Sequence, residues 1–598
     1  MTAAPPIDPA LTWGEDGLPR SGLYGDVYFS SDDGLAETRA VFLAGADLPH
    51  AWRDRERFVI GELGFGTGLN IAALLDLWRR ERPPGGRLHV FSVERHPLAV
   101  DDAARALARW PELEPVAAPL LAAWPRRARG FHRLDLPNLD AVIDLAVMDA
   151  AEALTQWQGR ADAWFLDGFA PASNPAMWRQ EVLDLVAARS APGARVATFT
   201  VAGAVRRGLQ AAGFAVEKRP GFGRKRERLE ASMPGGPAPV PPRRRVAVIG
   251  AGIAGASLAR AFRLAGAAVE VFDPRGAGGG ASGNPAALVS PRVDASLGPV
   301  AALYAQAQAR SADLYRATPD VVISEHTLLL ERTDRDGARF RTVADSDLFA
   351  PGSVVPLDQA ETAALADAPG LPGGVLFKDG LVIEPAPLLA AWAGTVRRES
   401  VARLESIGAG WRLRSADDAL LAEVDIVCLA AGHRSTTLLD GPPLQPIRGQ
   451  ASWTTEARLG QAISFGGYAA PTRDGLLFGA THDRDRDDET LDPADHQRNL
   501  AQLATLLPDL AGRLDAHALQ GRASVRAATA DRLPLAGRLA DNAFVLAGLG
   551  SRGFCLAPLL AEHLVALALG HPSPLPEPLG SLIDPVRFAR RARRKTSS

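Results

Sequence analysis

Cysteine is nearly absent from this chain of 598 residues, which contains only Cys428 and Cys555. Two cysteines exclude a disulfide scaffold and a cysteine-ligated zinc site. Long apolar runs are missing as well, so we expect no transmembrane helix. The opening segment MTAAPPIDPALTWGEDG lacks both the basic and the apolar region of a secretory signal. We therefore expect a cytoplasmic protein with no membrane partner and no bound metal, acting as a monomer.

An excess of positive charge is also missing, because the formal net charge is −3. The chain as a whole therefore carries no general signal for nucleic acid. With 47% hydrophobic and 23% charged residues, the composition is that of a globular protein long enough for several domains. A proline- and glycine-rich stretch at residues 232–243 predicts a linker between two domains, residues 1–231 and 244–598.

The first domain contains a glycine-rich loop between a predicted strand and a predicted helix. Residues 58–61 read as the strand, and residues 71–80 read as the helix. The loop between them has the pattern E-x-G-x-G-x-G, which is suited to a nucleotide-like ligand. Its candidate ligand-binding residues are Glu62, Gly64, Gly66 and Gly68.

Acidic residues follow three further predicted strands of this domain, as Glu94, Asp149 and Asp167. Each acid alone is more often a helix cap than a ligand contact. Ligands bind at the carboxyl edge of open α/β sheets, so the series after a glycine loop favours a binding site. Together these features predict an α/β, Rossmann-like domain.

This domain resembles class I S-adenosylmethionine-dependent methyltransferases, through Glu62, the glycines of the 64–68 loop, Glu94 and Asp149. The resemblance implies that the loop binds S-adenosylmethionine. It also implies that Glu94 binds the ribose and that Asp149 meets the adenine amine.

The segment from Asp167 to Trp178 holds the candidate catalytic group. Methyl transfer to an amine needs a neutral lone pair, and the Asp167 carboxylate can accept the amine proton. Phe169 and Trp178 could stack on a flat base. The alternative is a rigid proline-rich loop with Trp178 in the core. Upstream, residues 24–30 and 37–43 fit either a hairpin or a strand and a helix.

The second domain opens on the pattern G-x-G-x-x-G, formed by Gly250, Gly252 and Gly255 between two predicted strands. Gly250 permits the tight turn, Gly252 admits a pyrophosphate, and Gly255 lets the helix pack on the strand. Asp273 ends the second strand, where an acid binds ribose hydroxyls. The context predicts a dinucleotide-binding Rossmann domain.

This half resembles the D-amino-acid-oxidase-like flavoproteins, which implies bound FAD and an inserted α+β substrate domain at about residues 320–480. The resemblance lies in the glycine loop and in three later segments, ASGN at 281–284, AAG at 430–432 and GLGSRG at 548–553. The cofactor-binding residues that it implies in these segments are Ser282, Gly283, Asn284, Gly432, Gly548, Gly550, Ser551, Arg552 and Gly553. Arginine binds carboxylates in a bidentate manner, so Arg448, Arg526 and Arg552 are candidates for a substrate carboxylate.

Taken over nearly its whole length, the chain resembles the bacterial bifunctional tRNA 5-methylaminomethyl-2-thiouridine biosynthesis proteins. The specific segments are FGTGLN, the stretch from 162 to 178, GFGRKRE at 221–227, ASGN and GLGSRGF. The resemblance implies that the flavin half removes a carboxymethyl group from the wobble uridine and that the other half methylates the amine left behind.

Two alternatives remain open. The chain could oxidise and methylate a small glycine-type amine, which the acidic net charge mildly favours. It could also be a non-catalytic tRNA-binding module, although two intact nucleotide loops speak against that. Local basic patches at Arg224–Arg226, Arg243–Arg245 and Arg587–Lys595 offer contacts for a phosphate backbone, although a charge run of this kind is as often a solvated turn.

Overall fold

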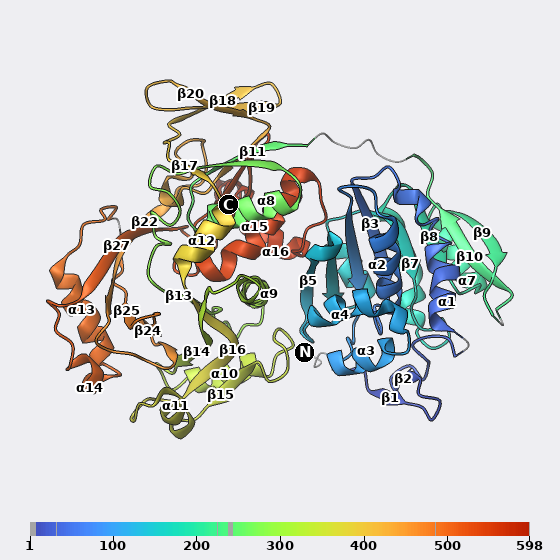
Figure 1. Ribbon diagram of the computed structural model, residues 1–598, viewed down its shortest axis with the longest axis horizontal. Coiled ribbons are helices and arrows are strands. Elements are labelled where there is room, and N and C mark those ends of the chain that lie inside the picture. Colours follow the sequence, from blue (N-terminus) through green and yellow to red (C-terminus); the bar gives the residue numbers. More distant parts are fainter. Residues whose placement is uncertain (1–7, 32, 224, 237–242, 485, 597–598) are drawn as a thin grey trace. The chain divides into compact units, whose positions relative to one another are not determined.

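The computed structural model describes residues 8–31, 33–223, 225–236, 243–484 and 486–596. The chain forms two compact units, unit 1 from Met1 to Pro241 and unit 2 from Pro242 to Ser598. Each unit contains its own sheet with a parallel central part (Figure 1). Residues 237–242 of the predicted linker lie outside the described part of the chain.

Unit 1 is built on an eight-stranded sheet in the order β5-β6-β4-β3-β7-β8-β10-β9. The central strands from β6 to β8 run parallel, and β5, β10 and β9 are antiparallel to their neighbours. The carboxyl ends of β3, β4, β6 and β7 therefore meet at one edge. The strands are β3 Arg57–Leu63, β4 Arg87–Val93, β5 Gly130–Leu136, β6 Ala141–Val147, β7 Ala161–Leu166, β8 Ser190–Thr198, β9 Ala215–Pro220 and β10 Glu227–Ser232.

Helices cover both faces of this sheet, so its central strands are apolar on both sides. Along β3, Phe58 and Ile60 enter one core, and Val59 between them enters the other. The first core also receives helices α2 Leu69–Glu81, α3 Val100–Leu107 and α4 Glu114–Ala122. The second receives helices α5 Ala150–Gln156, α6 Gln180–Ala188 and α7 Gly203–Ala211.

The segment before β3 is a small hairpin followed by helical turns. Strands β1 Leu11–Trp13 and β2 Pro19–Ser21 pair with each other, and α1 Gly34–Thr38 continues into a π-helical turn, η1 Arg39–Leu43. Residues 24–30, which the sequence leaves open as hairpin or strand, form a loop with a single bridge from Val27 to Arg20.

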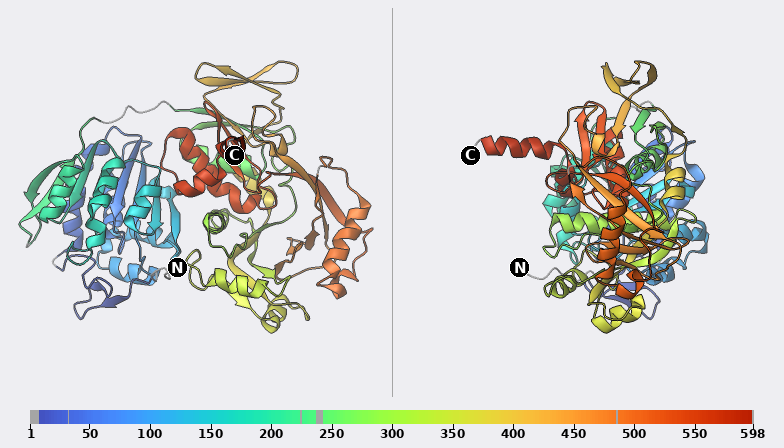
Figure 2. Two further views of the ribbon diagram at one scale, coloured as in Figure 1. Left: turned by 180° about the vertical axis from the view of Figure 1, so that it is seen from behind. Right: turned by 90° about the vertical axis from the view of Figure 1, so that its left-hand side faces the viewer.

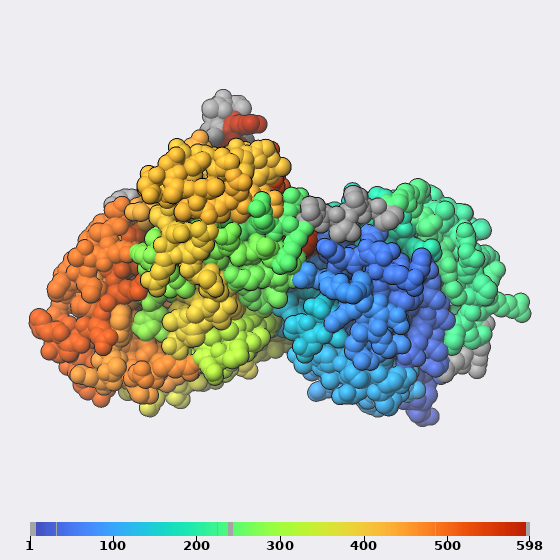
Figure 3. Space-filling view, turned by 45° about the horizontal axis from the view of Figure 1, so that its top comes forward, coloured from blue at the N-terminus to red at the C-terminus, as the bar shows by residue number. Residues whose placement is uncertain are grey.

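The first sheet of unit 2 has the order β17-β12-β11-β21-β29-β28, and all but β28 run parallel. Its strands are β11 Arg245–Ile249, β12 Ala268–Phe272, β17 Val396–Arg397, β21 Ile426–Leu429, β28 Leu535–Ala540 and β29 Ala543–Ala547. One face packs against helices α8 Ile253–Leu264, α9 Pro299–Arg316, α12 Pro385–Ala393, α15 Gly553–Leu569 and α16 Glu577–Ile583. The other face packs against a three-stranded sheet, β18 Arg403–Ile407, β19 Gly410–Arg414 and β20 Leu420–Val424. That small sheet forms a raised part of the surface in Figure 3, in yellow.

A second sheet of ten strands makes up the rest of unit 2. Its strands are β13 Ala287–Val289, β14 Val322–Leu330, β15 Val354–Leu357, β16 Gly374–Ile383, β22 Gln445–Thr454, β23 Ala462–Ser464, β24 Tyr468–Pro471, β25 Leu476–Gly479, β26 Asp483–Arg484 and β27 Gln520–Ala528. The helices beside it are α10 Asp336–Ala344, α11 Gln359–Ala366, α13 Pro493–Ala504 and α14 Pro508–Ala511.

The expectation of one insertion at about 320–480 differs from this arrangement. Strand β21 lies inside that range and belongs to the nucleotide sheet, whereas β27 lies beyond it and pairs with β22 along nine residues. The chain crosses between the two sheets several times, and strand patterns in a sequence do not identify pairing partners.

The last helix, α17 Val586–Thr596, leads away from the rest of unit 2 in the right-hand view of Figure 2. Its first turn is anchored, because the Arg587 Nε donates to Asp531 Oδ2 at 2.9 Å. No helix in the described residues is both long and apolar enough to cross a membrane.

Candidate active sites

The glycine loop of unit 1 connects β3 to α2 at the carboxyl edge of the sheet. Gly64, Gly66 and Gly68 all have positive φ values, of 97°, 52° and 77°. A side chain at Gly64 is also excluded by space, since its Cβ would lie 2.3 Å from the Asp167 carbonyl oxygen. The loop thus brings the end of β3 against the end of β7, and it places the first turn of α2 beside Asp167.

Glu94, the predicted ribose ligand, follows β4, and its side chain contacts this loop. Its carboxylate accepts hydrogen bonds from the Gly66 N–H at 3.1 Å and the His96 N–H at 2.9 Å. Burial raises the pKa of Glu94, and these backbone bonds oppose the rise. The geometry fits an acid that shapes the loop and presents an edge to a ligand.

Glu62, at the end of β3, is fully buried. Its Oε2 accepts a hydrogen bond from Ser92 Oγ at 2.5 Å, whereas Oε1 has no hydrogen-bond partner among the described residues. Burial raises the pKa of Glu62 to about 8, so this carboxyl group is largely protonated at neutral pH. A buried carboxyl oxygen without a hydrogen-bond partner among the described residues fits a site where a polar ligand supplies the hydrogen bond.

Asp149, the predicted adenine contact, caps α5 by accepting the Ala151 N–H at 2.9 Å. The same Oδ1 accepts a hydrogen bond from Arg179 Nη2 at 2.8 Å. The helix-cap interpretation therefore describes its contacts, and binding to an adenine amine stays a prediction.

Asp167, the candidate catalytic group, follows β7 directly. Its Oδ2 accepts a hydrogen bond from Asn70 Nδ2 in the first turn of α2, at 2.6 Å. Burial raises the pKa of Asp167 to about 7, although the Asn70 bond lowers it. A carboxyl group with this pKa is partly ionised at neutral pH and can take up or release a proton there.

Phe169 and Trp178, the two predicted stacking residues, are placed differently. Phe169 contacts two aromatic rings that sequence reasoning missed, Tyr24 at 5.0 Å and Tyr28 at 5.2 Å between ring centroids. Trp178 is buried, and its Nε1 donates to the Phe169 carbonyl oxygen at 2.8 Å. Trp178 therefore supports the loop from within the core, and the stacking expectation for it is not met.

Lys225, from the basic cluster of the 221–227 segment, lies close enough to Asp167 to lower its pKa. Lys225 Nζ pairs with Glu37 at 2.8 Å and lies 4.3 Å from the centre of the Phe199 ring. Arg226 is exposed, and Arg224 lies outside the described residues. Lys225 is thus an ion-pair partner at the border of the site, not a freely solvated cation.

The second glycine pattern forms a cradle in unit 2. Gly250 has a φ of 107°, and a Cβ there would lie 2.3 Å from the Ala430 carbonyl oxygen. A Cβ at Gly255 would lie 1.8 Å from the Gly250 carbonyl oxygen, so α8 can approach the strand only with glycine. Gly252 has no such backbone clash, because its Cβ would meet only Ser282 Oγ, at 3.1 Å. Its open side lies toward the cavity described next.

A cavity of about 1230 Å³ lies over this cradle. This volume exceeds the usual range of small-ligand sites, about 300–1000 Å³, and suits an extended dinucleotide together with a substrate. The predicted cofactor residues that line it are Gly250, Gly252, Asp273, Ser282, Asn284, Gly432, Gly548, Gly550, Ser551, Arg552 and Gly553. Gly255 and Gly283 pack behind the lining, against Gly250 and Gly278.

Polar groups of the cradle are arranged for a dinucleotide. Asp273 Oδ2 accepts the Ala251 N–H at 2.9 Å, and Ser282 Oγ accepts the Ile253 N–H at 3.0 Å. The Asn284 Oδ1 is buried and has no partner among the described residues. The Arg522 guanidinium holds the adjacent 278–280 loop by donating to three successive carbonyl oxygens at 2.8–3.1 Å.

The three arginines proposed for the substrate carboxylate have different surroundings in the structure. Arg448 is fully buried and bonds to Asp495 at 2.6 Å and to the Thr490 carbonyl oxygen at 2.6 Å. It does not line the cavity, so the structure does not support it as a substrate ligand. Arg526 and Arg552 both line the cavity.

Arg526 lies on β27 of the ten-stranded sheet and lines the cavity. It donates to the Thr481 carbonyl oxygen at 2.8 Å, and burial lowers its pKa. Tyr468 and Arg332, which sequence reasoning missed, line the cavity as well. Arg552 instead donates to the Ser290 carbonyl oxygen at 2.8 Å.

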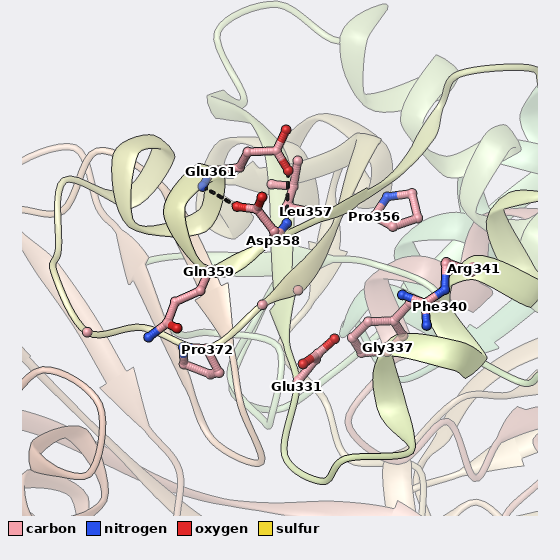
Figure 4. Close-up of a pocket in the computed structure, with 13 residues that line it drawn as sticks. Glu331, Gly337, Phe340, Arg341, Pro356, Leu357, Asp358, Gln359, Glu361 and Pro372 are labelled. Atoms are coloured by element: carbon pink, nitrogen blue, oxygen red, sulfur yellow. Dashed lines mark hydrogen bonds between the residues drawn. The ribbon is translucent and has the colours of Figure 1, made fainter.

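Another cavity, of about 720 Å³, lies in unit 2 between α10, β15 and α11 (Figure 4). Asp358 and Glu361 beside it form a capping box at the start of α11, with hydrogen bonds of 2.8 and 2.9 Å. Glu331 and Arg341 also line it. None of the predicted site residues lies there.

Comparison with known proteins identifies both units. The family model of the FAD dependent oxidoreductases matches residues 245–567, and that of S-adenosyl-L-methionine-dependent methyltransferases matches residues 111–234. The tRNA 5-methylaminomethyl-2-thiouridine biosynthesis bifunctional protein MnmC of Caulobacter vibrioides is 61% identical, over 97% of this chain and 97% of its own length. The chain belongs to the MnmC family.

A relative of the same name from Maricaulis maris is 43% identical over 98% of this chain and 97% of its own length. Among solved structures, glycine oxidase from Geobacillus kaustophilus covers 55% of this chain and 95% of its own, with 21% identity and a TM-score of 0.47.

Family membership makes the chain a bifunctional enzyme that uses FAD in unit 2 and S-adenosylmethionine in unit 1. The resemblance and the predicted α/β fold class are confirmed. The contacts described above fit both cofactors, through the cradle at Gly250 in unit 2 and the loop at Gly64 in unit 1.

Proposed function

We propose that the chain completes the side chain of 5-methylaminomethyl-2-thiouridine at the wobble position of tRNA. Unit 2 removes the carboxymethyl group of 5-carboxymethylaminomethyl-2-thiouridine and leaves a primary amine, which unit 1 methylates. The observation that carries the proposal is identity of 61% along nearly the whole length of a bifunctional MnmC protein. Such a substrate supports action in the cytoplasm, and we retain the monomer as our expectation.

The first step is an oxidation at the carbon between the amine and the carboxylate. FAD, when bound, accepts two electrons and a proton from that C–H bond. Water then adds to the imine that results, and the carboxymethyl group leaves as glyoxylate. The chain's own residues bind and orient the substrate for this step.

We assign the substrate carboxylate to Arg526. It lines the cavity, and among the described residues its guanidinium donates one hydrogen bond, at 2.8 Å to the Thr481 carbonyl oxygen, so donors remain for a ligand. Tyr468 lines the same cavity and can add a hydrogen bond. Arg552, in the 548–553 glycine loop, remains a second candidate.

The second step needs a neutral amine. A primary alkylamine is mostly protonated at neutral pH, as the lysine reference pKa of about 10.4 indicates. The Asp167 carboxylate accepts the proton and orients the lone pair toward the methyl group that S-adenosylmethionine supplies. Phe169, with Tyr24 and Tyr28 around it, offers an aromatic surface for the uridine base.

Mass analysis of wobble nucleosides tests the proposal. Incubation of tRNA from cells lacking this enzyme should give 5-aminomethyl-2-thiouridine without S-adenosylmethionine and 5-methylaminomethyl-2-thiouridine with it. Persistence of the carboxymethyl nucleoside with the yellow protein would contradict the assignment to unit 2. Accumulation of the primary amine with S-adenosylmethionine present would contradict the assignment to unit 1.

A further inference from the structure

A buried chain of three side chains leads from the N-terminal segment of unit 1 to Asp167. The Thr38 hydroxyl, at the end of α1, donates to Asn70 Oδ1 at 2.8 Å. Asn70 Nδ2, in the first turn of α2, donates to Asp167 Oδ2 at 2.6 Å. Thr38 and Asn70 are only 3% and 6% exposed, so water does not compete freely for these bonds.

The order of donors in this chain fixes the direction of the Asn70 amide. A carboxylate only accepts hydrogen bonds, and an amide oxygen turned toward it would meet it with two acceptors. The Thr38 hydroxyl occupies the amide oxygen and so keeps the NH₂ group toward Asp167. The sequence gives no sign of this link, because 97 residues separate Asn70 from Asp167.

Titratable groups from three other elements also lie near Asp167. Glu37 of α1 opposes a negative charge on it, whereas Lys225 of the β9–β10 connection favours one. Glu62 of β3 also lies close to Asp167, but burial raises its pKa to about 8 and keeps it largely uncharged at neutral pH. Lys225 is itself neutralised in part, because it pairs with Glu37. Asn70 is therefore the donor that touches the carboxylate directly and favours its ionised form.

We propose that Asn70, held in its orientation by Thr38, is a positioning residue that aims the Asp167 carboxylate at the methyl acceptor and keeps it ionised. The inference rests on the proposed function of unit 1. Asn70 does not itself take a proton or touch the transferred methyl group. It acts through Asp167, to which it donates its hydrogen bond directly.

The effect of losing Asn70 has a definite sign. Burial raises the pKa of Asp167 to about 7, and the hydrogen bond from Asn70 lowers it. Without that bond the pKa rises further, so a larger fraction of Asp167 is protonated at neutral pH. Methyl transfer is then lost first at low pH and recovers as the pH rises.

The test is the pH profile of kcat/KM for methyl transfer, measured on the full chain with tRNA carrying the primary amine. In Asn70→Ala the acid limb should move upward by about one to two pH units, as expected for a hydrogen bond to a charged group. Activity at pH 6.5 should fall about tenfold or more, and most of the loss should disappear by pH 9.

Thr38→Val should move the limb in the same direction but less, because the amide loses only its orientation. The double variant should match Asn70→Ala, since Thr38 acts through Asn70. Ser190→Ala is the matched control. It removes a buried hydroxyl of β8 that bonds to Trp164 of β7 and to the Val186 carbonyl oxygen of α6. These contacts are not part of this chain of bonds, so the limb should stay in place.

Two measurements separate this role from a structural one. The dissociation constant of S-adenosylmethionine should stay within about threefold of wild type, and oxidation by unit 2 should be unchanged in the same preparation. If Asn70→Ala does not fold, Thr38→Val carries the test alone.

An active wild type with an unmoved limb in Asn70→Ala would overturn the inference but leave the proposed function intact. Weaker cofactor binding with an unmoved limb would assign Asn70 to the cofactor and overturn it equally. A wild type that does not methylate this tRNA would refute both.

Discussion

Replacement of Arg526 by methionine should strongly weaken recognition of the carboxymethyl group without removing FAD. The substitution keeps an apolar stem of similar length and takes away the guanidinium. Arg526 belongs to β27 of the ten-stranded sheet, and its side chain donates a hydrogen bond to the Thr481 carbonyl oxygen. Within the described part of the chain, its side chain makes no hydrogen bond to the glycine loops of the cradle.

The size of the effect follows from the burial of the Arg526 guanidinium. Truncating one partner of a buried, hydrogen-bonded charge pair costs about 2–5 kcal/mol. At about 1.36 kcal/mol per factor of ten, kcat/KM for the carboxymethylated tRNA should fall roughly 30-fold to several thousandfold.

Arg448→Met provides the contrast. The sequence makes Arg448 a candidate for the substrate carboxylate as well, but the structure buries it against Asp495. Its removal leaves Asp495, whose side chain is 2% exposed, paired with Arg498 but without its buried arginine partner. Loss of one partner of a buried pair costs about 3–5 kcal/mol of stability. Arg448→Met should therefore lower the melting temperature, whereas Arg526→Met should leave it nearly unchanged.

Anaerobic reduction of the bound flavin, followed by absorbance, measures the first step alone. Arg526→Met should stay yellow and should be reduced slowly by carboxymethylated tRNA. Reduction at the wild-type rate would refute the assignment and move the carboxylate to Arg552. A colourless Arg526→Met protein would show that the residue serves the cofactor instead.

Further predictions concern both units. Gly252→Val places side-chain atoms into the cradle without a backbone clash, so the protein should lose its yellow colour yet still methylate tRNA that carries the primary amine; a fully yellow variant would rule out the cradle. Asp167→Ala should remove the carboxymethyl group and accumulate the primary amine, as measured by nucleoside mass analysis, and methylation at the wild-type rate would contradict its role. In the wild type, methyl transfer should rise with pH through about 7 as Asp167 loses its proton, so a flat rate between pH 6 and 8 would count against that proton acceptor. Lys225→Ala with Arg226→Ala should lower the slope of the salt dependence of tRNA binding by about 1.4–1.8 if both side chains contact phosphates, and an unchanged slope would mean that neither does.

Local motifs made the two ligand loops predictable. The glycines at 64, 66, 68 and 250 need positive φ values, and a requirement of that kind is visible in a few consecutive residues. The strand ends marked by Glu94 and Asp273 follow from the same alternation of strand, turn and helix. Both acids indeed contact their loops, through the Gly66 and Ala251 N–H groups.

Contacts between distant segments were not predictable in this way. Arg448 looked like Arg526 in sequence, and only the fold shows that one meets Asp495 and the other faces a cavity. Trp178 lies in the core, where its indole N–H donates a hydrogen bond to the Phe169 carbonyl oxygen. Tyr24 and Tyr28 contact Phe169 although they come much earlier in the chain, and no short sequence pattern indicates such a contact.

Strand β27 has a consequence for how substrate preference in unit 2 could change. Arg522 and Arg526 lie four residues apart, so they share one face of the strand at a spacing of about 13 Å. Arg522 holds the 278–280 loop beside the cofactor cradle, and Arg526 lines the cavity over that cradle. A point substitution at 526 can alter the preferred amine while the cradle remains intact. Deletion of a single residue between them would turn one arginine to the opposite face, so insertions and deletions in this strand should be far less tolerated in evolution than substitutions.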